Sequence, residues 1–271
     1  MQLKFIYPLW GSAHLELNDF LKKVKKAGYA GIEMDLPLEK KSKEEIVEMV
    51  ADHGLELVAQ HWETKNVNFA EHKAKFERHL YNLAEVEPLF INSHTGLDFF
   101  SFAQNAELIE LAFSIEQSTG VAITHETHRS RFSFAAHICQ SFLKEYPSLK
   151  LTSDFSHWCC VAETLLENQE QAVDLAIAHS FHVHARVGST QSAQVIDPRE
   201  ARYAAELIQF KAWWKRMVGN AAAQGRSFIS ITPEYGPYPY AQYLPHTNNL
   251  LADQWEINQF IRSEIELNCE T

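Results

Sequence analysis

Residues 150–185 read KLTSDFSHWCCVAETLLENQEQAVDLAIAHSFHVHA and contain one strand–helix–strand unit. The runs KLTSD (150–154) and FHVHA (181–185) are short, and their apolar, β-branched and aromatic residues are typical of buried strands. Between them, residues 167–179 carry apolar side chains at helical spacing. The stretch therefore predicts a strand, a helix and a second strand in succession.

The same unit recurs along the whole chain. Comparable strand-like runs occupy residues 3–7, 31–35, 57–61, 89–93, 121–125, 150–154, 181–185 and 227–231. Amphipathic segments lie between them, at residues 15–27, 43–53, 71–83, 106–117, 134–143, 167–179 and 210–223. Eight such units predict an α/β chain folded as a single (β/α)8 TIM barrel domain over residues 1–271. A doubly wound open sheet is the rival architecture, but it would need two domains, and no linker divides the chain.

The interval before the last predicted strand is the longest. It contains residues 187–203 (VGSTQSAQVIDPREARY), which are too polar for a core and too numerous for a simple turn. We expect this segment to be a functional loop or a lid.

Composition excludes several classes of function. Lys and Arg total 24 against 35 Asp and Glu, and a formal net charge of −11 argues against a nucleic-acid partner. The four cysteines form neither a disulfide framework nor a CxxC motif, which is typical of a reducing compartment. No signal-peptide pattern and no apolar run of about 18 residues occurs, so we expect a cytoplasmic protein without a membrane partner.

Acidic and imidazole side chains gather at the ends of the later predicted strands, where a TIM barrel places its active site. These residues are Glu126, Asp154, His184 and Glu234. Three carboxylates and one imidazole suit one divalent ion such as Mn²⁺, Mg²⁺, Co²⁺ or Zn²⁺, whose charge would relieve their mutual repulsion. Each residue alone is equally well explained as a capping or ion-paired group. Their shared position favours a metal site.

Other strand ends carry groups suited to a carbohydrate. Trp10 lies just beyond the first strand, where its flat face can stack on a sugar ring. Arg186 can bind a carboxylate or phosphate through its fork of N–H groups, as can Arg129 and Arg131. Several histidines also fall at or near strand ends: His61, His94, His125, His128, His157, His182 and His184. An ordinary packing role remains open for each of these side chains.

The ordered series Glu126, Asp-x-x-His (154–157), His-x-His (182–184) and Pro-Glu-Tyr-Gly (233–236) resembles the xylose-isomerase-like TIM barrels. This superfamily contains sugar phosphate isomerases and epimerases, ketose 3-epimerases and endonuclease IV, and the resemblance covers nearly the whole chain. It implies that the four residues named above bind the metal and that Glu126 and Glu234 are also catalytic, moving a proton. The substrate-binding residues that we expect are Trp10, Glu33, His61, His94, His157, His182 and Arg186.

Two departures from the family pattern bear on function. The epimerases place an arginine about six residues after the strand-seven histidine, where this chain has Thr190, so the anchoring of the substrate is open. Endonuclease IV has an Asp-x-His pair in the loop after strand seven, whereas the loop here offers Asp197 without a histidine. Together with the negative net charge, this argues against DNA repair.

The sequence therefore predicts a divalent-metal-dependent sugar isomerase or epimerase that works by proton transfer through an enediolate. Two alternatives stay open: a metal-dependent keto-sugar lyase or hydrolase on the same barrel, and a non-catalytic sugar-binding barrel. The expected partner is a small-molecule carbohydrate. The outer helices and the aromatic segment after Tyr235 are compatible with a homo-oligomer.

Overall fold

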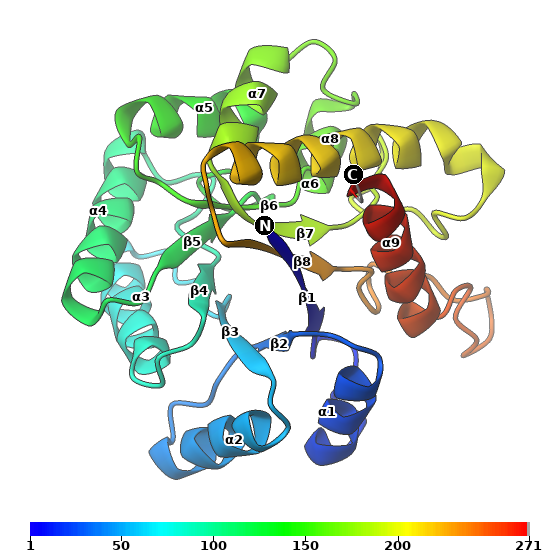
Figure 1. The fold of residues 1–271 in the computed structure, drawn as a ribbon. Coiled ribbons are helices and arrows are strands. Elements are labelled where there is room, and N and C mark those ends of the chain that lie inside the picture. Colours follow the sequence, from blue (N-terminus) through cyan, green and yellow to red (C-terminus); the bar gives the residue numbers. More distant parts are fainter. Residues whose placement is uncertain (270–271) are drawn as a thin grey trace.

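The computed structural model describes residues 1–269. Parallel strands form a closed barrel in chain order from β1 to β8, with β8 pairing back onto β1 (Figure 1). Their bounds are β1 (Gln2–Pro8), β2 (Gly31–Met34), β3 (Glu56–His61), β4 (Phe90–Ser93), β5 (Ile123–Glu126), β6 (Leu151–Ser153), β7 (Ser180–Ala185) and β8 (Phe228–Pro233). The prediction of a (β/α)8 TIM barrel is confirmed.

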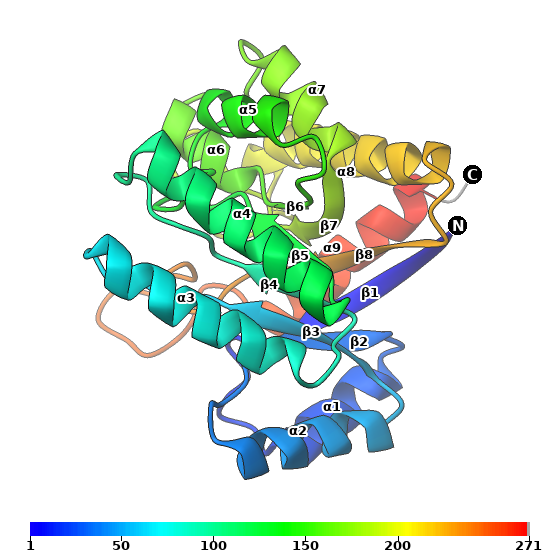
Figure 2. The ribbon, with the colours of Figure 1, turned by 90° about the vertical axis from the view of Figure 1, so that its left-hand side faces the viewer.

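Helices surround the barrel on its outer face, as Figures 1 and 2 show from two directions. They are α1 (Leu17–Lys26), α2 (Lys40–Asp52), α3 (Phe69–Ala84), α4 (Phe102–Thr119), α5 (Ala136–Glu145), α6 (Ser156–Ala162), α7 (Glu170–Ala178), α8 (Ala204–Ala223) and α9 (Gln254–Cys269). Each of the seven amphipathic segments expected from the sequence overlaps a helix. The short α6 and the C-terminal α9 are additional to those expectations.

Local sequence signals set the ends of the longer helices. Helix α4 begins at a capping box, in which the Ser101 side chain accepts from the Gln104 amide while the Gln104 side chain accepts from the Ser101 amide. It ends at Gly120, whose φ of +73° lies in the left-handed region that glycine adopts without a steric penalty. Helix α3 begins after Asn68, whose side chain accepts from the Glu71 amide.

The interior of the barrel changes from apolar to polar along its axis. Ile6, Val58 and Phe90 form a separate, fully buried cluster near the amino-terminal ends of the strands. Nearer the carboxyl ends, the inward positions are polar and still buried: Glu33, Asn92, Glu126, Asp154, His182, His184, Ser230, Thr232 and Glu234. Burial of so many charged groups is unusual unless they pair with one another or bind a ligand. The polar half of the barrel is therefore the candidate location of a functional site.

The segment after β7 differs in part from its sequence expectation. It is irregular apart from a short 3-10 turn at Ala201–Tyr203, as a loop should be. Several of its residues are nevertheless buried, among them Val187, Gln194 and Val195. It therefore packs against the barrel. Among the described residues, no helix is long and apolar enough to cross a membrane.

Candidate active site

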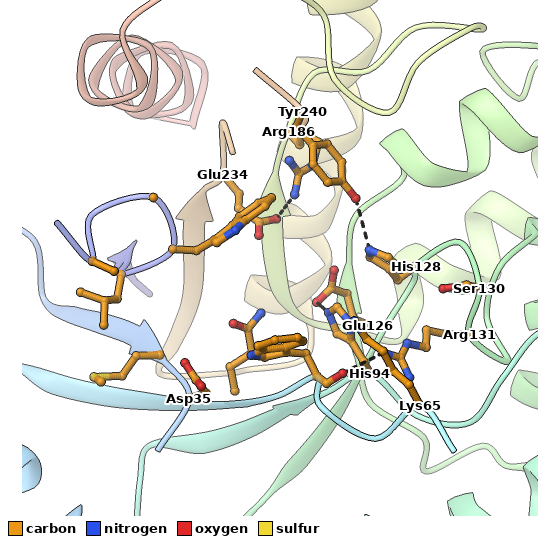
Figure 3. Close-up of a pocket in the computed structure, with 17 residues that line it drawn as sticks. Asp35, Lys65, His94, Glu126, His128, Ser130, Arg131, Arg186, Glu234 and Tyr240 are labelled. Carbon is orange, nitrogen blue, oxygen red and sulfur yellow. Dashed lines mark hydrogen bonds and ion pairs between the residues drawn. The ribbon is translucent and has the colours of Figure 1, made fainter. Parts of the chain in front are cut away.

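A cavity of about 420 Å³ opens at the carboxyl ends of the strands (Figure 3). Its residues come from strands β2, β3 and β5, from the loops after β1 to β5, and from the segments that follow β7 and β8. They are Leu9, Trp10, Gly11, Ala13, Met34, Asp35, Gln60, Trp62, Lys65, His94, Glu126, His128, Ser130, Arg131, Arg186, Glu234 and Tyr240. The half-exposed rings of Trp10 and Trp62 lie on its wall. An aromatic rim above a polar floor is suited to a small polar molecule.

Two buried carboxylates and one imidazole meet at the floor of this cavity. Nδ1 of His184 lies 2.9 Å from Oε2 of Glu234 and 3.5 Å from Oε2 of Glu126. Neither approach has the alignment of a hydrogen bond, so this buried nitrogen has no hydrogen-bond partner. One potential ligand atom from each of the three residues lies within 4.8 Å of the others. These side chains are three of the four predicted metal ligands.

Asp154, the fourth predicted ligand, is held differently. Its Oδ1 accepts from the backbone amide of Ser156 at 2.9 Å and from the Ser156 hydroxyl at 2.5 Å. Its Oδ2 accepts from Nε of Arg186 at 3.0 Å, and Nη2 of the same guanidinium donates to Glu234 at 2.6 Å. Arg186 therefore bridges two of the carboxylates expected to bind the metal, which the spacing of the sequence did not predict.

The environment of Arg186 fixes its position. Nη1 donates to the Gln194 side chain at 3.0 Å, and the guanidinium lies 4.7 Å from the ring centre of Tyr240 and 5.5 Å from that of Trp10. The side chain is almost completely buried, yet it contributes to the wall of the cavity. A cation enclosed in this way by carboxylates and aromatic faces has little freedom to move.

A second polar layer lies beneath the cavity floor. The Glu33 carboxylate accepts from the Asn92 amide at 2.8 Å and from the Thr232 hydroxyl at 2.8 Å, and its Oε2 lies 2.9 Å from Nε2 of His184. His182 lies 3.4 Å from the same carboxylate and 2.9 Å from the Ser230 carbonyl. Glu33 and His182, both expected to bind substrate, support His184 from below and do not line the cavity.

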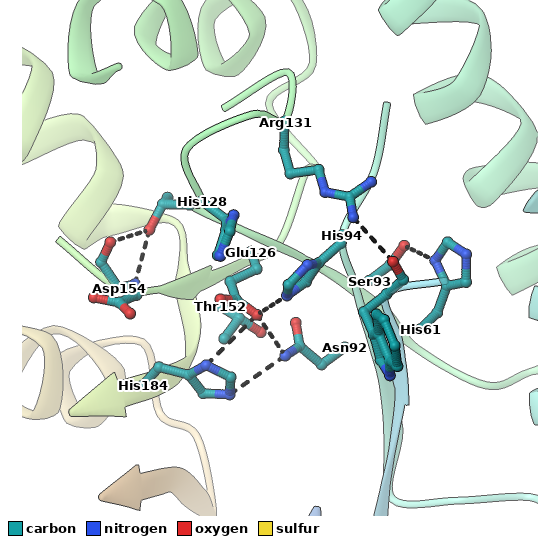
Figure 4. Close-up of polar contacts among 12 residues, drawn as sticks. His61, Asn92, Ser93, His94, Glu126, His128, Arg131, Thr152, Asp154 and His184 are labelled. Atoms are coloured by element: carbon teal, nitrogen blue, oxygen red, sulfur yellow. Dashed lines mark hydrogen bonds and ion pairs between the residues drawn. The ribbon is translucent and has the colours of Figure 1, made fainter. Parts of the chain in front are cut away.

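Three imidazoles stack along one side of Glu126 (Figure 4 labels the first two of them). Ring centres of His94 and His128 are 4.6 Å apart, and those of His128 and His157 are 3.9 Å apart. Nε2 of His94 lies 2.8 Å from Oε2 of Glu126. His157 is fully buried, and neither of its ring nitrogens has a hydrogen-bond partner. His94 lines the cavity as the sequence predicts, whereas His157 lies behind His128.

His61 lies away from the cavity. It packs edge-on against Phe76 of α3, and its ring nitrogens lie 3.0 Å from the Ser93 hydroxyl and 2.8 Å from the Thr64 hydroxyl (Figure 4). Its neighbour Gln60 faces the cavity instead. Adjacent residues of a strand point to opposite faces. The prediction took His61 as the inward-facing residue, whereas the inward-facing residue is its neighbour Gln60.

Sequence reasoning also missed several residues that the structure brings to the cavity. Asp35 and Tyr240 line it without having been singled out individually, although the aromatic run around Tyr240 had been noticed. Arg131, which the sequence offered as a carboxylate or phosphate binder, lines the cavity, but it donates to the carbonyl groups of Trp62, Thr64 and Gly96. Its position soon after a predicted strand indicates a place near the cavity. The sequence around it contains no motif that predicts hydrogen bonds to backbone carbonyl groups.

Charges within the site shift its ionisation. Burial alone would raise the pKa of Glu126, but the neighbouring His94 and His184 lower it well below its usual value. Burial would lower the pKa of His184, but Glu234, Glu33 and Glu126 raise it well above its usual value. For Asp154, burial raises the pKa to about 6, with Glu234 and Glu126 adding to that effect and Arg186 opposing it. Such opposed shifts within one cavity are typical of catalytic sites.

Comparison with known sequences and structures gives contrasting results. No protein-family model matches the sequence, and no curated protein matches it. A D-allulose 3-epimerase from Methylomonas sp. superposes with a TM-score of 0.65 and 14% identity over 98% of both chains. A probable 3-DHS dehydratase from Bacillus anthracis gives 0.58 and 15% over 98% of this chain and 99% of that one.

Endonuclease IV from Thermus thermophilus is a third similar structure, with a TM-score of 0.58 and 12% identity over 98% of both chains. Identities this low show a common fold and leave the reaction open, because these three names describe different chemistries. The structural neighbours across the full length of the chain are xylose isomerase-like TIM barrels, and this chain has their fold.

Proposed function

We propose that this chain is a divalent-metal-dependent isomerase or epimerase that acts on a sugar by proton transfer. The observation that carries the proposal is the convergence of Glu126 and Glu234 on His184 at the floor of one cavity. Carboxylate oxygens within 4.8 Å of one another can reach the same carbon atom of a substrate or two neighbouring ones.

Three side chains of the site are suited to hold a divalent metal ion. Glu126, His184 and Glu234 would hold it, because Nδ1 of His184 has no hydrogen-bond partner and lies between the two carboxylates. Asp154 fits less well, since both of its oxygens already accept hydrogen bonds from the protein. When bound, a divalent ion would polarise a substrate carbonyl and lower the pKa of the adjacent C–H group.

The chain's own residues have distinct tasks in this proposal. Glu126 enters from β5 and Glu234 from the end of β8, so one carboxylate can take a proton and the other can return it. The Arg186 guanidinium donates to Glu234 at 2.6 Å and holds this carboxylate in place. Trp10 and Trp62 offer flat faces to the C–H side of a sugar ring. The similarity to a D-allulose 3-epimerase adds support at the level of fold.

Hydrogen exchange with solvent tests the proposal directly. The protein is incubated with Mn²⁺ and a panel of ketoses and keto-sugars in D₂O, and NMR follows the carbon that gains deuterium. We expect deuterium uptake without loss of a leaving group. Glu126→Gln and Glu234→Gln should each slow the exchange at least about 100-fold. Glu167→Gln, at an exposed position, is the matched control and should leave the rate unchanged.

Each other result has a defined meaning. Loss of a leaving group with deuterium uptake would support the lyase or hydrolase. Sugar binding without any exchange would support a non-catalytic barrel. Exchange that survives both glutamine substitutions would refute the assignment of the two carboxylates.

A further inference from the structure

Arg131 is a buried cation on the cavity wall that has no carboxylate partner. Its side chain is 2% exposed, and among the described residues no carboxylate oxygen lies within 4.0 Å of its guanidinium nitrogens. Arginine is rarely buried without a partner, because an isolated charge loses its solvation. Arg186, the other buried guanidinium of the cavity, has two partners, Asp154 and Glu234. Arg131 therefore carries a charge that no close carboxylate neutralises.

Backbone carbonyl groups satisfy only part of this guanidinium. Nη1 of Arg131 donates to Thr64 at 2.9 Å and to Gly96 at 3.4 Å, and Nη2 donates to Trp62 at 3.0 Å. A guanidinium has five N–H groups, so at least two of them have no acceptor in the part of the chain that the structure describes. One of these is Nε, which is buried and has no hydrogen-bond partner. The side chain has donors left for a ligand.

The charge of Arg131 persists at neutral pH. Burial lowers its pKa to about 10, while Glu126, Asp98 and Glu63 raise it from beyond ion-pair distance. The side chain is therefore still a cation at pH 7, and a negative charge placed near it would replace the solvation that it has lost.

Lys65 adds a second unpaired cation to the same part of the cavity. It follows Trp62 and Thr64, whose carbonyl groups accept from Arg131, and it also lines the cavity. Its Nζ lies 4.8 Å from the ring centre of Trp62, and within residues 1–269 no carboxylate oxygen lies within 4.0 Å of it. Two cations without carboxylate partners thus belong to one region of the wall.

Positive and negative groups on the wall are separated in space. Figure 3 shows Asp35 and Glu234 on the left of the cavity and Lys65 and Arg131 on the right. A ligand with one anionic end would be attracted by the two cations and repelled by the carboxylates. The charge distribution therefore favours one orientation of such a ligand.

We propose that the cavity takes a sugar that carries an anionic group, a carboxylate or a phosphate, and that Arg131 and Lys65 bind this group. This inference names the substrate class of the function proposed above and rests on that function. The anionic oxygens would accept from the guanidinium and from the ammonium group. The opposite end of the sugar would then lie toward Glu126 and Glu234.

Three ketoses that differ at carbon 6 test this binding site. D-Fructose is neutral there, D-fructuronate carries a carboxylate, and D-fructose 6-phosphate carries a phosphate. Equilibrium dialysis of each isotopically labelled sugar in the presence of Mn²⁺ measures affinity whether or not the sugar is converted. We expect at least one charged ketose to bind about 10-fold or more tightly than D-fructose, with a preference that shrinks as salt is added.

Two variants assign the preference to the two cations. Lys65→Met keeps the unbranched stem beside Trp62 and removes the charge, so the charged ketose should bind no more tightly than D-fructose, whose own affinity should stay the same. Arg131→Met should have the same effect, and circular dichroism verifies that it is folded. Because Lys65 is exposed and makes no hydrogen bond in the structure, its variant tests the site even where Arg131→Met does not fold. Lys144→Met, at an exposed position of α5, is the matched control and should retain the preference.

The outcomes separate this inference from the proposed function. Equal affinity for the three ketoses, binding of none of them, or a preference that survives in either folded variant would overturn the anion site, while deuterium uptake into D-fructose would still support the isomerase or epimerase. A preference that both variants abolish, without deuterium uptake into any sugar, would support the anion site and refute the proposed reaction. The ketose that shows the preference identifies the anionic group as a carboxylate or a phosphate.

Discussion

Replacing Arg186 with methionine should destabilise the protein strongly at neutral pH. The substitution keeps an unbranched side chain of similar length but removes the cation between Asp154 and Glu234. Both carboxylates are buried. Among the described residues, Arg186 is the only arginine or lysine that pairs with either of them. Asp154 then keeps Ser156 and, at 3.6 Å, His157, whereas Glu234 keeps His184 at 2.9 Å.

The magnitude follows from the contacts that are lost. Removing one partner of a buried ion pair costs about 3–5 kcal/mol, because it leaves an uncompensated buried charge. Arg186 donates at 3.0 Å to Asp154 and at 2.6 Å to Glu234, and only Glu234 keeps a cationic neighbour in His184, so a cost near the middle of that range is expected. For a chain of this size, a loss of about 4 kcal/mol lowers the melting temperature by roughly 8–16 °C. The penalty should shrink at acidic pH, because the stranded Asp154, whose pKa burial raises to about 6, can then be protonated.

Urea unfolding followed by circular dichroism at pH 7.5 and pH 5 measures both effects. Arg202→Met is the matched control, because Arg202 is 71% exposed and its pair with Glu200 spans 3.5 Å, so the loss should be at most about 1 kcal/mol. Added Mn²⁺ should restore stability to Arg186→Met, since the freed carboxylate oxygens can bind it. A loss of less than about 1 kcal/mol at pH 7.5, or one that grows at pH 5, would refute the reasoning.

Two further predictions concern the layers around the cavity. Glu33→Gln should lower the free energy of unfolding at pH 7, because His184 and His182 lower the pKa of Glu33 against the opposing effect of burial. This stabilisation is present above the pKa of the unfolded state and is lost as pH falls, so the stabilities of variant and parent should converge in acid. A constant difference in urea titrations at several pH values would contradict this. Arg131→Met should cost about 1–3 kcal/mol and weaken ligand binding, because the carbonyl groups of Trp62, Thr64 and Gly96 lose their donor. Calorimetric titration with a ketose that gains deuterium in the D₂O assay would contradict this if the affinity were unchanged.

The sequence was sufficient for the architecture because strand and helix patterns act locally. Each predicted strand overlaps an observed one, and the regular alternation with helices leads directly to the barrel. The additional helix α9 was not expected, because a long irregular stretch from Tyr235 to Asp253 separates it from β8 and breaks the regular spacing. Its apolar residues Ile257, Ile261 and Ile265 are buried in the folded chain.

Prediction of the site was less complete, for a geometric reason. Both faces of a barrel strand are buried, so apolar alternation does not reveal which residues point inward. This explains why His61 was expected in the cavity where Gln60 lies. The pairing of Arg186 with Asp154 depends on two strands meeting in space, and no spacing in the sequence encodes the length of an arginine side chain.

The apolar cluster of Ile6, Val58 and Phe90 bears on how solvent reaches the interior of the barrel. It fills part of the barrel interior with apolar side chains, while the cavity beside Trp10 and Trp62 reaches the Glu126 and Glu234 carboxylates. A ligand that covers this cavity would exclude bulk water from the carboxylates that line it. The local dielectric constant then falls, and each ion pair at the floor of the cavity becomes stronger. Ligand binding at the rim would therefore change the electrostatic field at the floor.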